Sequence, residues 1–197
     1  MALVSEDGND LINEVKACRI CASKLAAGPR PVVQIGCEAR LLIAGQAPGK
    51  KVHETGIPFD DPSGETLRAW LGIDRTVFYD PRQVAILPMA FCYPGRGRSG
   101  DLPPPPECAR HWRARLLATM PKIRLKVVIG RYAQDYHLGS DARPTLTETV
   151  RAFEDYLPSH IPLPHPSPRN RPWLKRHPWF EAEVLPALRN WVTETLS

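Results

Sequence analysis

Three short, largely apolar runs that end at glycine or proline constrain the fold of this chain most strongly. They cover residues 41–44, 84–87 and 126–129, and segments with helical periodicity separate them. Runs of this length without polar alternation are typical of strands buried on both faces, and strands that alternate with helices form parallel sheets. With a further extended segment at residues 162–164, the pattern predicts an α/β fold. We expect a three-layer α/β/α sandwich with a central, mostly parallel four-stranded sheet.

The helices of this fold are predicted from apolar residues that recur every three or four positions. Ser63 is a plausible N-cap for the second of them, because its hydroxyl can accept a hydrogen bond from the first turn. The expected helical segments are residues 10–25 (as one helix or two), 66–71, 107–120, a stretch from residue 132, 147–153 and 179–192.

Length and charge narrow the class of protein. The 197 residues fit a single domain spanning residues 1–197. No apolar run approaches the roughly 20 residues that span a bilayer, and residues 1–10 are too polar for a signal peptide, so we expect a cytoplasmic protein without membrane contact. We also expect a monomer. The net charge of +5 and isoelectric point near 9.1 are compatible with a polyanionic partner but do not require one.

Two loops carry the residues best suited to a site. The first, residues 45–51, follows the first strand, at the end of a parallel sheet where ligands bind; it lacks the spacing of a phosphate-binding P-loop, and an ordinary strand-to-helix turn would also explain it. The second, residues 163–172, holds His165 between prolines that fix the backbone, followed by Arg169 and Arg171. A rigid loop of this kind suits a site for an anionic polymer, although a surface turn has the same composition.

Together, the two loops resemble two motifs of the uracil-DNA glycosylase superfamily. Gly45-Gln46-Ala47-Pro48-Gly49 is similar to its glycine-polar-x-proline loop, and His165-Pro166-Ser167-Pro168-Arg169-Asn170 to its loop beginning His-Pro-Ser. The segment between them, Thr55-Gly56-Ile57-Pro58-Phe59, looks most like the thermostable, iron-sulfur-containing branch (family 4). The sequence His-Pro-Ser-Pro-Arg-Asn is closer to the single-strand-selective branch. The resemblance covers most of residues 10–192 and implies a DNA glycosylase of base excision repair.

The same resemblance implies a cofactor. The iron-sulfur branch holds a [4Fe-4S] cluster with four cysteines, whose places here are taken by Cys18, Cys21, Cys92 and Cys108. From the residues alone, a C-x2-C pair in a reducing compartment favours a metal or redox site over a disulfide. Four thiolates suit either an iron-sulfur cluster or tetrahedral zinc, and four unrelated buried cysteines are a further alternative. Cys37 has no counterpart in that set.

Excision of a base implies a division of roles among the loop residues. The base must be flipped out of the strand, and His165 would stabilise the negative charge that develops on its carbonyl oxygen. Phe59 would stack on the flipped base, and the tip at residues 168–171 would fill the gap that it leaves. Gln46 and His53 are the other catalytic candidates. The base pocket is expected to include Ala47, Pro48, Pro88 and Ser167, and the DNA contacts Lys50, Lys51, Arg169, Asn170, Arg171 and Lys175, unless these charges form only a solvated face.

Three departures from the superfamily pattern leave the substrate open. Ala47 stands where several members carry Asp or Asn to orient the attacking water, Gln46 where the iron-sulfur branch has Glu, and Pro88 near the place of an asparagine that reads uracil. The missing group could come from His53, Glu54, Asp60 or Asp61. We favour His53, which is nearest the first motif and carries an imidazole, the side-chain type best suited to proton transfer at physiological pH; a carboxylate there is more often a cap or turn residue.

The sequence therefore predicts a monofunctional DNA glycosylase that hydrolyses the N-glycosidic bond of uracil or another deaminated base in single- or double-stranded DNA. One alternative is a member that binds DNA lesions without turnover. Another is an α/β enzyme that uses the same loops on a free nucleotide. Steep salt dependence of oligonucleotide binding would separate the first two from the third.

Overall fold

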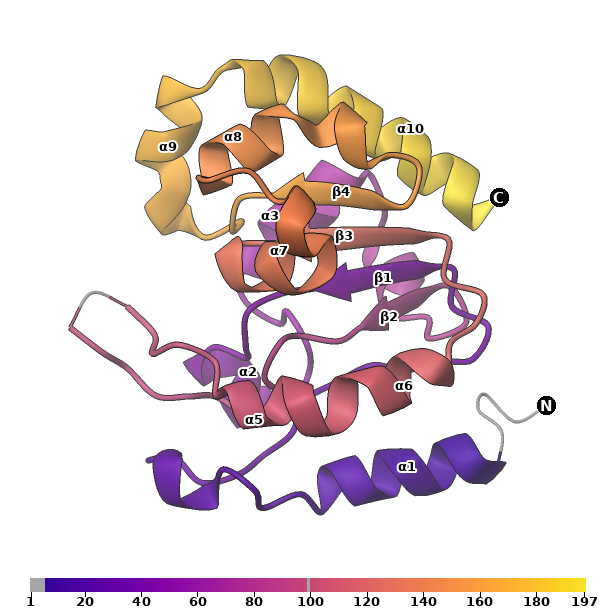
Figure 1. Cartoon of the computed structure of the whole chain (residues 1–197), viewed down its shortest axis with the longest axis vertical. Coiled ribbons are helices and arrows are strands. Elements are labelled where there is room, and N and C mark those ends of the chain that lie inside the picture. Colours follow the sequence, from indigo (N-terminus) through magenta and orange to yellow (C-terminus); the bar gives the residue numbers. More distant parts are fainter. Residues whose placement is uncertain (1–5, 99) are drawn as a thin grey trace.

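Four parallel strands form one sheet at the centre of the molecule (Figure 1). The computed structural model describes residues 6–98 and 100–197, and the side chains from residue 10 onward. The strands lie in the order β2-β1-β3-β4, so that the chain crosses over between every pair of neighbours. Their bounds are β1 Leu41–Ala44, β2 Val84–Ile86, β3 Leu125–Ile129 and β4 His160–Leu163. The predicted three-layer α/β fold is confirmed.

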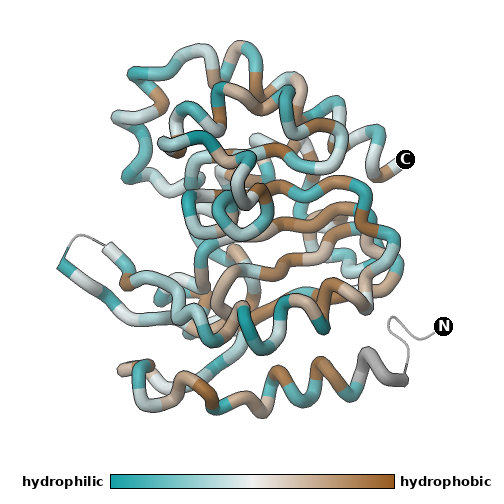
Figure 2. The backbone as a smooth tube through the Cα atoms, in the orientation of Figure 1, coloured by the Kyte–Doolittle hydropathy of each residue, from teal (hydrophilic) through white to brown (hydrophobic). Residues whose placement is uncertain are grey.

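Helices cover both faces of the sheet because side chains alternate along each strand. In β1, Leu41 and Ile43 face a core shared with α3, α8 and α10, whereas Leu42 faces one shared with α1 and α6. Figure 2 shows that hydrophobic residues follow the strands between these layers. The helices are α1 Glu6–Lys16, α2 Lys50–Thr55, α3 Pro62–Leu71, α4 Arg75–Phe78, α5 Pro106–Cys108, α6 Ala114–Ala118, α7 Arg131–Leu138, α8 Leu146–Arg151, α9 Arg171–Arg176 and α10 Leu185–Leu196.

Several predicted boundaries differ from the structure. The helix expected from residue 10 to 25 ends at Lys16, and only a 3-10 turn at Ala22–Lys24 follows. The helical run expected at residues 107–120 is present as α5, a π-helical segment at Ala109–Arg113 and α6. No described helix is long and apolar enough to cross a membrane.

The N-cap predicted at Ser63 is wrong. Asp61 caps α3 instead, since its Oδ1 accepts a hydrogen bond of 2.9 Å from the Gly64 amide, and Pro62 occupies the first helical position, where its missing N–H is not needed. Ser63 lies buried inside the first turn. Both Asp and Ser are good caps, and the proline between them decides which one is used.

Arg113, at the end of the π-helical segment before α6, is fully buried next to His137 of α7, whose ring lies 6.1 Å from that of His160. Its Nη1 donates hydrogen bonds of 2.9 Å to the carbonyl oxygens of both Leu87 and Pro88, and its Nη2 lies 2.6 Å from His137 Nε2. That nitrogen must accept, so His137 is neutral. Burial and the neighbouring Arg113 lower the pKa of His137 to about 2, and burial with Lys126 lowers the pKa of His160 to about 4.

Because of His137 and His160, we expect the free energy of unfolding to fall as the pH falls below about 6.5, the ordinary histidine pKa. Their folded pKa values are depressed, so the unfolded chain takes up protons that the folded chain does not between pH 6.5 and about 4. Each histidine lowers the free energy of unfolding by at most about 1.4 kcal/mol per pH unit, and the partly exposed His160 lowers it by less. We expect urea unfolding to give about 2 to 4 kcal/mol less stability at pH 5 than at pH 7.5.

Two variants distinguish this origin from a general acid effect. His160→Gln should weaken the pH dependence, whereas His111→Gln, at an exposed position, should leave it unchanged. A free energy of unfolding that is flat between pH 7.5 and 5 would contradict the assignment.

Candidate active site

A cavity of about 550 Å³ lies at the carboxyl ends of β1, β2 and β4. Four segments meet around it: the loop after β1, the turn before α3, the loop after β4 and the hairpin formed by residues 95–98 and 100–102, which projects at the left of Figure 1. Its lining comprises Val32, Gly45–Lys50, Val52, Pro58, Phe59, Asp61–Ser63, Ile86, Pro88, Tyr93, Arg96, Asp101, His165 and Ser167–Asn170.

The loop after β1 is fastened on two sides. The backbone carbonyls of Gly45 and Gln46 accept hydrogen bonds of 2.8 and 3.0 Å from the amides of Met89 and Ala90, which follow β2. The Gln46 side-chain amide donates to the Leu102 carbonyl at 3.3 Å. Gln46 therefore connects the first motif to the projecting hairpin, a contact that the sequence did not predict.

His165 is held in one protonation state by its own loop. The Ser167 amide donates to His165 Nδ1 at 3.2 Å, and the Asn170 side chain donates to the His165 carbonyl at 2.7 Å. Because Nδ1 accepts, the proton of the neutral ring sits on Nε2. Burial, helped by Arg169, lowers the pKa of His165, and the opposing attraction of Asp61 and Asp101 does not reverse this. At neutral pH the imidazole is therefore an uncharged hydrogen-bond donor.

Phe59 forms one wall of the cavity close to the end of β1. Its ring packs edge-on against Phe78, with the centroids 6.2 Å apart, and reaches over Gly45. A Cβ at Gly45 would lie 3.4 Å from the tip of the Phe59 ring, which leaves little room for a larger residue there. Ile86 and Pro88 add apolar surface at the end of β2.

The structure brings most of the predicted site residues into this one cavity. Those that line it are Gln46, Ala47, Pro48, Lys50, Phe59, Pro88, His165, Ser167, Arg169 and Asn170. Parallel strands make this possible, because their carboxyl ends share one edge of the sheet.

Four predicted residues lie elsewhere. His53 packs against Tyr93, with ring centroids 6.1 Å apart, and is not part of the lining; its Nδ1 is buried without a partner. The structure therefore gives no support to the catalytic role expected for His53. Lys51 on α2 and both Arg171 and Lys175 on α9 are exposed outside the cavity.

Sequence reasoning missed Asp101 and named Asp61 only as an alternative to His53. Both line the cavity, and the Oδ2 atom of each lies 3.9 Å from the position that a Cβ on Gly49 would take. Asp61 Oδ1 is used by the cap of α3. Asp101 reaches the site through the hairpin, which closes with a hydrogen bond of 2.9 Å from the Leu102 amide to the Gly95 carbonyl. No local pattern in the sequence could have indicated this placement.

The four cysteines Cys18, Cys21, Cys92 and Cys108 border a second, much smaller cavity of about 20 Å³. Trp112 Nε1 donates to Cys18 Sγ at 3.2 Å, and the Phe91 amide donates to Cys108 Sγ at 3.4 Å. Burial raises the pKa of Cys92 to about 11 and that of Cys108 to about 12.

Within residues 6–98 and 100–197, no three His, Cys, Asp or Glu side chains lie close enough together to hold one metal ion.

The family model of the uracil DNA glycosylase superfamily matches residues 33–189, which include both loops of the large cavity. The chain belongs to this superfamily. Membership of this superfamily implies that DNA is the substrate, and it supports DNA glycosylase activity in general. The match begins after Cys18 and Cys21, so it covers only Cys92 and Cys108 of the four cysteines.

Among solved structures, the chain is similar to the solution NMR structure of a protein from Methanosarcina acetivorans, which is provisionally assigned as a uracil DNA glycosylase. The sequences are 16% identical, the TM-score is 0.48, and the similarity covers 81% of this chain and 94% of that chain.

Proposed function

We propose that this protein is a monofunctional DNA glycosylase that hydrolyses the N-glycosidic bond of uracil or another deaminated base. The observation that supports this best is the neutral His165, whose Nδ1 is occupied by the Ser167 amide, in the same cavity as Phe59. A flipped base would stack on Phe59 and receive a hydrogen bond from His165 Nε2 at a carbonyl oxygen. This bond strengthens as the bond to the sugar breaks and the base becomes an anion.

Water is the nucleophile in this proposal. Lys50, the only lysine among the described residues of the lining, has a side chain that is 77% exposed, whereas an attacking lysine amine is activated by burial. Asp61 or Asp101 would supply the polar group that several members of the superfamily carry at the position of Ala47. One of these carboxylates would orient a water molecule and accept its proton as the oxygen bonds to the sugar carbon, while the base leaves as an anion and is protonated afterwards.

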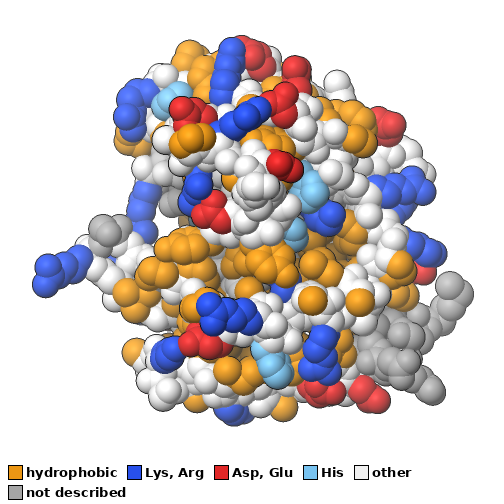
Figure 3. Space-filling view, viewed as in Figure 1, with side chains coloured by type: hydrophobic (Ala, Val, Ile, Leu, Met, Phe, Trp, Pro, Cys, Tyr) orange, Lys and Arg blue, Asp and Glu red, His pale blue; other side chains and the backbone are white. Residues whose placement is uncertain are grey.

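Basic residues around the cavity would bind the phosphates. Arg169 lines the cavity beside the uncharged amide of Asn170, and the basic side chains of Lys51, Arg171 and Lys175 on the helices α2 and α9 are exposed. On the face drawn in Figure 3, Lys and Arg side chains are spread among Asp and Glu and form no single patch. Few Lys and Arg side chains line the cavity itself, so we expect a small number of phosphate contacts and a moderate loss of affinity with salt.

The end of β2 offers little to discriminate one base from another. Pro88 has no N–H, and its carbonyl oxygen already accepts from Arg113. A site strongly rejects the wrong ligand when its buried polar groups would be left unpaired, and the apolar wall of Ile86 and Pro88 lacks such groups. This supports a preference that includes bases other than uracil.

A strand-cleavage assay tests the proposed activity. Labelled oligonucleotides that carry uracil, hypoxanthine, xanthine or a thymine mismatch, in single and double strands, are incubated with the protein and then treated with alkali. Cleavage at one lesion supports the glycosylase. Because Ala47 removes a usual catalytic side chain, the second candidate is a protein that binds lesions without turnover; tight binding without cleavage would favour it.

For the cofactor, we propose a [4Fe-4S] cluster held by Cys18, Cys21, Cys92 and Cys108. All four cysteines border one small cavity, and four thiolates suit a cluster of this kind. The donors to two of the sulfurs are of the kind that stabilise cluster ligands. A bound cluster would serve to fasten the segment after α1 to α5.

We expect the protein purified without oxygen to be brown and to contain about four iron atoms per chain. Cys108→Ser should lower the iron content and the thermal unfolding temperature together, because the ligands come from three separate segments. Cys37→Ser is the matched control and should retain the iron. A colourless protein with one zinc per chain would contradict the cluster.

A further inference from the structure

Phe59 has a strained backbone. Among residues 6–98 and 100–197 it is the only residue other than glycine with a positive φ, at 53°. For a residue with a Cβ and a bulky ring, this conformation is strained and persists only where the surroundings impose it. The turn is partly closed by a hydrogen bond of 3.3 Å from the Asp60 amide to the Ile57 carbonyl, which alone does not fix the ring.

Two side chains outside the cavity hold this turn. The Tyr79 hydroxyl donates a hydrogen bond of 2.8 Å to the Pro58 carbonyl. Arg68 on α3 reaches the Phe59 carbonyl and the Tyr79 hydroxyl, each at 3.5 Å, and its guanidinium lies over the Phe78 and Tyr79 rings. Burial raises the pKa of Tyr79, so the hydroxyl stays a donor at neutral pH. Neither Tyr79 nor Arg68 lines the cavity.

The backbone of α3 closes the turn from the other side. A Cβ at Gly64 would lie 1.8 Å from the Phe59 carbonyl oxygen, so only glycine allows this approach. The Phe59 ring then rests on Phe78, the last residue of α4. Phe59 is thus fixed between α3 and the end of α4 before any ligand binds.

We infer that Tyr79 is a positioning residue that holds Phe59 ready to stack on the extruded base, by binding the carbonyl of Pro58. This inference rests on the proposed function. The strain is maintained by contacts that a base does not touch, so the ring need not be ordered when the base arrives. Removal of the hydroxyl would let the turn relax toward a negative φ and tilt the ring out of its place in the cavity.

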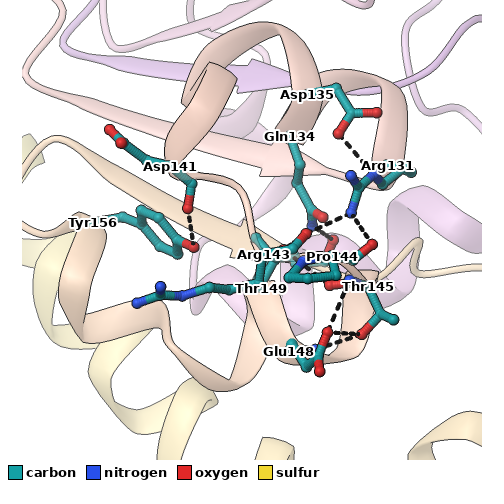
Figure 4. A network of polar contacts seen from close by, with 11 residues as sticks. Arg131, Gln134, Asp135, Asp141, Arg143, Pro144, Thr145, Glu148, Thr149 and Tyr156 are labelled. Atoms are coloured by element: carbon teal, nitrogen blue, oxygen red, sulfur yellow. Dashed lines mark hydrogen bonds and ion pairs between the residues drawn. The ribbon is translucent and has the colours of Figure 1, made fainter.

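The test uses non-cleavable 2′-fluoroarabino analogues of deoxyuridine and deoxyinosine in labelled oligonucleotides, with anisotropy to measure affinity. One net hydrogen bond contributes about 1 kcal/mol, so we expect Tyr79→Phe to weaken analogue binding about 5-fold. Binding of an undamaged strand should be unchanged. Tyr156→Phe is the matched control: its hydroxyl also donates to a backbone carbonyl, that of Asp141 at 3.0 Å (Figure 4), and neither residue lines the cavity.

A double-mutant cycle separates positioning from a general loss of stability. If Tyr79 acts through Phe59, Tyr79→Phe should have no further effect on analogue binding in a Phe59→Ala background. An equal loss in both backgrounds, or Tyr79→Phe binding like the wild type, would overturn the inference while leaving the proposed function intact. A wild-type protein that prefers neither analogue over an undamaged strand would instead overturn the proposed function, and the inference with it.

Discussion

His165→Ala is expected to slow base excision about 100- to 1,000-fold while oligonucleotide binding stays close to that of the wild type. The reason lies in the loop that carries the residue. The Ser167 amide occupies Nδ1, so Nε2–H is the only donor that the ring can offer to a departing base. A donor that acts on charge developing in the transition state contributes to the rate and little to ground-state affinity.

The measurement is single-turnover excision on the base that the cleavage panel identifies, with affinity measured on the non-cleavable analogue. His111→Ala, at an exposed position on the helical run that follows Cys108, is the control and should change neither quantity. Equal losses in rate and affinity for His165→Ala, together with a lower unfolding temperature, would make the residue structural.

Arg113→Ala is expected to lower the free energy of unfolding by about 3 kcal/mol or more. The side chain is fully buried, and its removal leaves the carbonyls of Leu87 and Pro88 and the Nε2 atom of His137 without their donor. Each buried group left unpaired costs roughly 1 to 3 kcal/mol, partly offset because a buried charge is removed as well. Burial lowers the pKa of Arg113 only to about 10, so it is a cation at neutral pH.

Arg115 provides a matched control two residues further along the chain. It is exposed and pairs with Glu14 at 2.9 Å, so Arg115→Ala should cost less than about 1 kcal/mol in urea unfolding. If the two variants were equally stable, the buried network would not contribute as we describe. A second consequence concerns the site: because Arg113 fixes the carbonyl of Pro88, we expect Arg113→Ala to loosen the wall of the cavity at the end of β2.

Three strands of the sheet followed from local sequence patterns, whereas the bounds of β4 did not. Runs such as residues 41–44 are apolar throughout, as a strand that is covered on both faces requires, so β1 and β2 were predicted within one residue. The edge strand β4 contains Pro162, which would disfavour a central strand, and it begins two residues earlier than expected. The prediction of Ser63 as an N-cap was wrong because Asp61 and Ser63, both adequate caps, flank Pro62, and the direction of the backbone decides which of them caps α3.

The candidate site, too, was predicted from the sequence only in part. The sequence by itself determined that the loops bearing Gln46 and His165, together with Phe59, would meet at one edge, because parallel strands bring their carboxyl ends together. Only the tertiary structure decided that Asp101 enters the cavity, that His53 stays out of its lining, and that Phe59 adopts a positive φ. Those outcomes depend on how a hairpin folds back, on which side of a short helix a side chain lies, and on contacts from Tyr79 and Gly64. Such long-range packing balances energies of about 1 kcal/mol each, and no local pattern of residues encodes that balance.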